Sequence, residues 1–260
     1  MSKSLDILRA ENYNQKCKEP LTFQEEINMK TISASAAPEN SNKKRIALII
    51  FSAAYIILIQ IFHRIYPLLP FYRRDVSTAI QLIGYCIFGI SGIILFKDLF
   101  AAGFREWKAH PFKNLGLLIG GFLIMMLCDV IMATFSVTLG FESMNQNNVM
   151  EALKTAPVLL TFIAIGIMGP VTEETFFRFI MVGKAKEKIP AVICIIVSAV
   201  CFGLIHMHAL TVSELVSCLP QLTTGLLFAI LLVKCKNPTI PVLLHILNNC
   251  IGIIPPLLKR

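Results

Sequence analysis

The sequence has few charged residues and no regular pattern of glycine or proline. Only 15% of its 260 residues are charged, against roughly 25% in an ordinary soluble domain, and 55% are hydrophobic. The shortage of charge excludes a water-soluble globule, and the high apolar content excludes disorder over most of the length. The 14 glycines and 13 prolines follow no period, which excludes a collagen-like or low-complexity chain. A polytopic membrane protein remains.

The eight cysteines are scattered, contain no CxxC pair and lie mostly inside apolar runs. They are typical of small buried side chains and not of a disulfide framework or a zinc finger. The net charge of +8 could suit nucleic acid, but the cations cluster at the ends of apolar runs and not on an interleaved aromatic face. We therefore expect membrane lipid as a partner and no nucleic acid.

Continuous apolar runs of helix length predict an all-α fold, because the strands of a membrane barrel would alternate in polarity instead. We predict a polytopic membrane bundle of about seven transmembrane helices, preceded by a polar arm at residues 1–45 that could be disordered. Lysine and arginine are more numerous on the amino-terminal side of these spans, which places the amino terminus in the cytosol, although Arg73 and Arg74 count against it. The predicted spans are 46–62, 76–96, 114–141, 155–172, 189–205, 215–233 and 237–258.

Ionisable residues at membrane depth are costly and mark a site by default. The segment TEETFFR at 172–178 follows an apolar run and Pro170. On a helix, Glu174 and Arg178 stand four residues apart and can form an ion pair, whereas Glu173 is turned about 100° away. Glu173 is therefore the candidate base, and Glu174 with Arg178 the candidate support.

Two histidines add further candidates. FGLIH places Phe202 and His206 on one helix face, and HILNN places His245 and Asn249 four residues apart in a run with no other charge. Asp129 stands alone in the third run, where we expect it to pair with a buried donor and not to act as a catalytic group.

Peptide hydrolysis needs a base, a donor to the oxyanion and a proton source for the leaving amine. In a metal route, His206, His245 and Glu173 would bind one divalent, zinc-like ion that activates water. In a metal-free route, Glu173 with His206 would deprotonate water while His245 and Asn249 donate to the oxyanion. The HExxH motif typical of zinc peptidases is absent. The spacing of the residues leaves both routes open.

The three motifs, taken in order, resemble those of the CAAX prenyl protease and bacteriocin-processing family, also called CPBP or Abi. They are EExxxR at Glu173, Glu174 and Arg178, FxxxH at Phe202 and His206, and HxxxN at His245 and Asn249. The resemblance covers residues from about 145 to 254 and includes the NQ of MNQNN upstream.

This resemblance implies an intramembrane endopeptidase, in a bacterial plasma membrane, that cuts a lipid-modified (CAAX-like) protein or a short membrane-associated peptide. Glu173 matches the first glutamate of the family motif. The family is usually called metallopeptidase, and a metal-free glutamate mechanism has also been proposed for it, so both routes stay open. Phe179 stands where many members have glycine, a departure that we expect to alter packing. The chain would then comprise the arm, three spans at 46–141 and a catalytic core of about four helices at 142–260.

Two functions of other classes compete with this interpretation. A non-catalytic immunity or scaffold protein could keep the fold, but the complete set of acid, base and donor disfavours it. A small-solute transporter could use the same groups as a proton relay, but the chain has no evident inverted repeat. Upright helices would place His206 and His245 at different depths. We therefore expect tilted or re-entrant helices around a cavity that opens to the cytosol.

Overall fold

The computed structural model describes residues 41–141, 143–235 and 237–258, so most of the predicted arm at residues 1–45 lies outside the described residues. Within these ranges the chain is helical and has no strand, which confirms the all-α prediction. The first half comprises α3 (Ser41–Ala54), η1 (Tyr55–Ile61), α4 (Phe62–Ile65), η2 (Tyr66–Leu68), α5 (Arg74–Leu95), α6 (Lys97–Ala109) and α7 (Pro111–Thr138). The second half comprises α8 (Met144–Thr155), α9 (Val158–Thr161), η3 (Phe162–Met168), α10 (Gly169–Glu173), η4 (Glu174–Lys184), η5 (Ala185–Glu187), α11 (Ala191–Leu204), α12 (Val212–Ser217), α13 (Leu219–Lys234) and α14 (Thr239–Leu258).

Among the residues that the structure describes, six continuous helical stretches are long and apolar enough to cross a membrane, as expected of an integral, multi-pass membrane protein. The seventh predicted span, 189–205, corresponds to α11, which has only 14 residues and is about 21 Å long. The count of about seven therefore comprises six full spans and one short helix. The six are Asn42–Leu68, Arg74–Leu95, Pro111–Thr138, Val158–Glu187, Val212–Lys234 and Thr239–Leu258.

The predicted end of the fourth span at residue 172 is wrong. The helix runs through Pro170 and the charged motif to Glu187, for 30 residues in all. Pro170 removes one backbone donor from this helix, and the carbonyl oxygens of Ile165 and Gly166, one turn earlier, accept instead from the side chains of Asn249 and Cys250 on α14. Hydropathy ends a span where charges begin, but Glu174 and Arg178 of this motif pair with each other inside the bundle.

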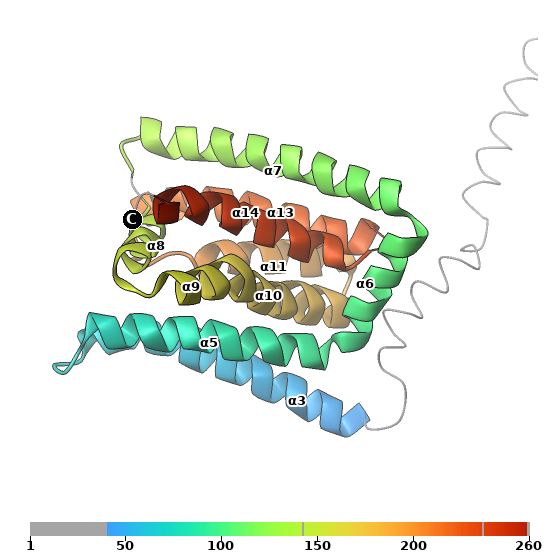
Figure 1. Cartoon of the computed structure of the whole chain (residues 1–260), viewed down its shortest axis with the longest axis horizontal. Helices are drawn as coiled ribbons and strands as arrows, with labels where there is room; N and C mark the ends of the chain where they lie inside the picture. Colours follow the sequence, from blue (N-terminus) through green and yellow to red (C-terminus); the bar gives the residue numbers. More distant parts are fainter. Residues whose placement is uncertain (1–40, 142, 236, 259–260) are drawn as a thin grey trace, which may run out of the picture. The chain divides into compact units, whose positions relative to one another are not determined.

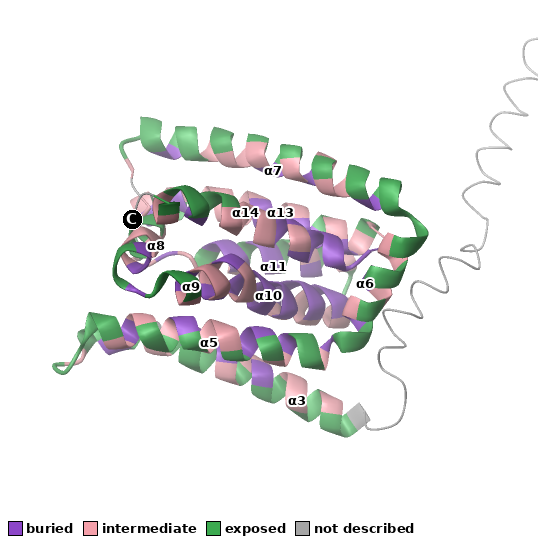
Figure 2. Cartoon of the chain, viewed as in Figure 1, coloured by how far each residue is buried: buried purple, intermediate pink, exposed green. Residues whose placement is uncertain are grey.

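This long helix occupies the centre of the helical bundle. Its α10 and η4 segments pack against α5, α11, α13 and α14, while α7 packs on the outer side of α13 and α14 (Figure 1). Buried residues concentrate on α10 and on the η4 segment that follows it, and exposed residues cover much of α7 (Figure 2). Many exposed residues of α7 are apolar, including Leu123, Leu127 and Val130. An apolar exterior around a core with charged residues is the arrangement that a lipid environment favours.

Candidate active site

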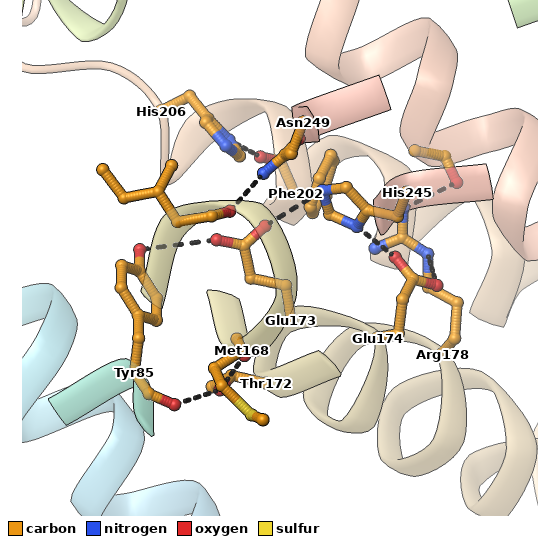
Figure 3. Close-up of polar contacts among 12 residues, drawn as sticks. Tyr85, Met168, Thr172, Glu173, Glu174, Arg178, Phe202, His206, His245 and Asn249 are labelled. Carbon is orange, nitrogen blue, oxygen red and sulfur yellow. Dashed lines mark hydrogen bonds and ion pairs between the residues drawn. The ribbon is translucent and has the colours of Figure 1, made fainter. Parts of the chain in front are cut away.

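Glu173 and Glu174 begin the site at the junction of α10 and η4. Consecutive helical residues point about 100° apart, so the two carboxylates meet different neighbours. The Glu173 side chain reaches the Tyr85 hydroxyl of α5, which donates to Glu173 Oε1 over 3.4 Å (Figure 3). Glu174 turns instead toward Arg178 and His245.

The predicted ion pair between Glu174 and Arg178 is present. Arg178 Nε lies 3.2 Å from Glu174 Oε2, and both side chains are fully buried. The guanidinium also lies over the ring of Phe202, with its central carbon 4.2 Å from the ring centroid. Aromatic faces attract desolvated cations, so Phe202 helps to hold Arg178 inside the membrane core.

His245 lies between the two carboxylates (Figure 3). Its Nδ1 is 2.9 Å from Glu174 Oε1, and its Nε2 is 3.6 Å from Glu173 Oε2. Since Glu174 is paired with Arg178 as a carboxylate, it can only accept, and Nδ1 of His245 is the donor. Nε2 of His245 is then the ring nitrogen that lies next to the Glu173 carboxylate. The imidazole next to Glu173 is thus that of His245, whereas the sequence predicted His206 as its partner.

His206 follows the end of α11 with one ring nitrogen already engaged. Its Nδ1 lies 2.7 Å from the carbonyl oxygen of Phe202, and because a carbonyl can only accept, Nδ1 carries the hydrogen. Nε2 of the neutral ring is consequently an acceptor. Burial lowers the pKa of His206 from its ordinary value of 6.5 to about 4, which keeps the ring neutral near pH 7.

Asn249 lies one helical turn beyond His245 on α14. Its Nδ2 donates to the carbonyl oxygen of Ile165, in η3, over 3.0 Å. A carboxamide nitrogen carries two hydrogens, so one donor of Asn249 remains for another group.

These side chains converge on one cavity of about 330 Å³, as the sequence predicted. Glu173, His206, His245 and Asn249 all line it. Because α11 ends at Leu204, His206 follows directly after the helix end and lies close to His245 of α14. The ring centroids of His206 and His245 are 4.9 and 5.6 Å from that of Phe202.

Asp129 of α7 also lines this cavity. The Thr224 hydroxyl donates to Asp129 Oδ1 over 2.8 Å. This pairing with a donor on a neighbouring helix agrees with the expectation from the sequence. Asp129 brings a second carboxylate to the cavity besides Glu173.

The predicted metal set does not fit a shared ion. Among the residues that the structure describes, no three His, Cys, Asp or Glu side chains are grouped closely enough to hold a metal. Nδ1 of His245 and Nδ1 of His206 are both engaged with protein oxygens, which leaves Nε2 as the other ring nitrogen of each. His206, His245 and Glu173 line one cavity, but they are not among any close group of three such side chains in the described part of the chain.

Several polar residues of the cavity were not predicted from the sequence. Gln60 and Arg64 are four residues apart in the first span, and Gln81 and Tyr85 are four residues apart in the second; all four line the cavity. An isolated glutamine inside an apolar run, with a polar residue one turn later, is a signal that could have identified them. Asn145 and Gln146, the NQ of MNQNN, line the cavity as well.

Comparison with known proteins finds one family and one curated relative to which part of the chain is similar. Residues 155–251 match the family described as type II CAAX prenyl endopeptidase Rce1-like. A protein of Bacillus subtilis (strain 168) named "Putative membrane peptidase YdiL" is 28% identical over 139 residues, which are 52% of this chain. The chain spans about half the length of this curated relative, 54%. No solved structure matches the chain significantly.

The matched segment contains all three motifs, from Glu173 to Asn249, and its family is the one that the motifs resemble. Through this segment, the chain is similar to the type II CAAX prenyl endopeptidase family and to a membrane protein named as a putative peptidase.

Proposed function

We propose that this protein is an intramembrane endopeptidase in which Glu173 activates a water molecule. The observation that carries the proposal is the convergence of Glu173, His206, His245 and Asn249 on one cavity inside the helical bundle. In such a set, the carboxylate can act as the base and proton carrier, and the imidazoles and the carboxamide can bind the water and donate to the oxyanion.

In the proposed reaction, a water molecule lies between Glu173 and His206. It donates one hydrogen to the Glu173 carboxylate and the other to Nε2 of His206, which accepts because Nδ1 is committed to Phe202. The water oxygen attacks the peptide carbonyl carbon as Glu173 takes a proton, and the carbonyl becomes an oxyanion. When the C–N bond breaks, Glu173 passes that proton to the leaving nitrogen. No net proton is gained or lost.

The oxyanion needs donors in a site from which bulk water is excluded. The second N–H of Asn249 supplies one, and His245 supplies another when its ring carries a second hydrogen, on Nε2. Glu174 and Arg178 act through His245, since Glu174 fixes which ring nitrogen faces Glu173.

We assign the water activation to Glu173 without a metal. The support is the spacing of the candidate ligands, none of which form a group of three among the described residues. The substrate class follows from the family: a peptide, or a protein with a lipid-modified carboxyl terminus.

The test compares purified wild type with Glu173→Gln on prenylated and unmodified peptides in detergent, with and without a chelator. We expect Glu173→Gln to lower turnover by about 10²–10⁴-fold, the range for loss of a general base. Glu187→Gln is the matched control, because Glu187 is an exposed residue at the end of the same helix that pairs with Lys184. Glu187→Gln should cleave like the wild type. The wild type and Glu187→Gln should both keep their activity in the presence of the chelator.

Equal turnover by wild type and Glu173→Gln would contradict the proposal. Loss of activity in chelator, restored by zinc, would overturn the metal-free assignment alone. Tight binding of a peptide without cleavage would favour the immunity or scaffold function, and exchange of labelled solute in liposomes would favour transport.

A further inference from the structure

Arg64 of α4 forms hydrogen bonds with the backbone before and after His206. Its Nη2 donates to the carbonyl oxygen of Ile205 over 2.6 Å and to that of Met207 over 3.1 Å. More than 140 residues of sequence separate these partners, and α4 belongs to the first membrane span. The contact therefore joins two distant parts of the bundle at the residue next to the cavity.

Arg64 is itself held in a fixed position. Its Nη1 donates to the carbonyl and side-chain oxygens of Gln60, over 2.7 and 3.0 Å. Gln60 in turn donates to the hydroxyl of Tyr55, a fully buried residue that packs against aromatic rings of α5 and η4. Among the described residues no carboxylate pairs with Arg64, so its donors are committed to neutral oxygens.

The segment after α11 needs such support because it is not helical. Residues 205–210 form turns and bends between α11 and α12. From the other side, Glu214 accepts the backbone N–H of His208 over 3.0 Å. The carbonyls next to His206 and the amide two residues later are thus held by two charged side chains from different helices.

We propose that Arg64 is a positioning residue that holds the His206 imidazole in the orientation needed to bind the attacking water. The proposal rests on the proposed function, in which Nε2 of His206 accepts a hydrogen bond from that water. Holding the carbonyls of Ile205 and Met207, the residues before and after His206, together with the bond from Nδ1 to Phe202, leaves the ring little freedom.

Only arginine suits this position. The guanidinium is a planar fork with five donors, so it can span two carbonyls and Gln60 at once. A lysine ammonium is a compact point charge on a flexible stem, and it would hold one of these oxygens at a time.

The test uses the full-length protein in detergent with Arg64→Met and Arg64→Lys, and with Arg74→Met as a matched control. Arg74 is exposed, lies at the start of α5 beyond the same connecting segment and does not line the cavity. The readouts are kcat and KM, the midpoint of thermal unfolding, and the nitrogen NMR signals of labelled histidine rings. The His206 signals are identified by their loss in His206→Asn.

We expect Arg64→Met to lower kcat by about tenfold to a hundredfold, the scale of a misplaced catalytic group, with KM unchanged. Arg64→Lys should restore only part of the loss. In both variants the His206 signals should move while those of His110 stay, and Arg74→Met should match the wild type throughout.

If Arg64→Lys folds and its His206 signals and kcat equal those of the wild type, the inference is overturned. This comparison tests the inference even if Arg64→Met does not fold. A rise in KM with constant kcat would also overturn it, by making Arg64 a substrate-binding residue. If wild type cleaves no peptide, the proposed function fails, while the NMR signals still decide whether Arg64 orients His206.

Discussion

At the scale of single residues, the site depends on how each buried charge is satisfied. Glu174 holds Arg178 and His245 together, and Arg178 is enclosed by aromatic rings. A buried ion pair costs desolvation energy that its attraction roughly offsets, so its main effect is to fix geometry. Here it fixes the ring nitrogen that His245 presents to Glu173.

Removing one member of this pair should be far more damaging than removing both. Arg178→Met leaves Glu174 as a buried, uncompensated charge, which costs about 3–5 kcal/mol of stability. The double variant Glu174→Gln/Arg178→Met should lose less than the sum of the two single losses, as measured by unfolding in detergent. Lys184→Met, in the exposed pair with Glu187, should cost about 0–1 kcal/mol. Strictly additive losses would show that Glu174 and Arg178 do not interact.

The half-buried ring of His206, with its lowered pKa, predicts a dependence of stability on pH. Its pKa is about 4 in the folded protein against an ordinary 6.5, so between these values the unfolded chain binds more protons. Stability contributed by the neutral ring is present above pH 6.5 and is lost as the pH falls toward 4. The unfolding midpoint of wild type should therefore fall more between pH 7 and pH 4 than that of His206→Asn. Parallel curves would contradict the burial of this ring.

At the scale of helices, close packing around Phe202 connects the Glu174–Arg178 pair to the histidines that line the cavity. Phe202 lies under Arg178, its ring contacts His206 and His245, and its carbonyl holds His206. The neighbouring helix α13 approaches it at Gly225, where a Cβ would lie 2.9 Å from Phe202 Cδ1. The contact between α11 and α13 is therefore part of the site's construction.

Gly225→Ala should disturb both stability and activity, because the added methyl must displace a ring that is enclosed on all sides. We expect a loss of about 1–3 kcal/mol, the usual cost of overpacking, and a fall in turnover. Gly120→Ala is the matched control on α7, since a Cβ there meets nothing within 4 Å. It should keep or raise stability through better helix propensity. Equal unfolding midpoints for the two variants would show that the helices separate easily at Gly225.

At the scale of the whole molecule, the sequence predicted what local spacing determines. The pair Glu174–Arg178 follows from a four-residue interval, and the all-α fold follows from the apolar runs. The position of His245 between two carboxylates depends on how α14 packs against α10, which no local pattern encodes. The continuation of the fourth span through Pro170 was missed for the same reason, since the partners of its charges lie on other helices.

The orientation of the bundle in the membrane stays a prediction. The start of α3 and the carboxyl end lie at opposite ends of the helices (Figure 1), and the distribution of lysine and arginine places the amino terminus in the cytosol. Alkaline phosphatase, which is active only outside the cytosol, should therefore be active when fused after Arg260 and inactive when fused after Lys188. The reverse pattern would invert the topology.

The most direct test of the central claim is to locate the water. A cryo-EM map of the detergent-solubilised protein, at a resolution that reveals ordered waters, should contain a peak within hydrogen-bonding distance, about 3 Å, of both the Glu173 carboxylate and Nε2 of His206. A map in which these two groups face separate spaces, or in which a side chain fills the space between them, would contradict the mechanism.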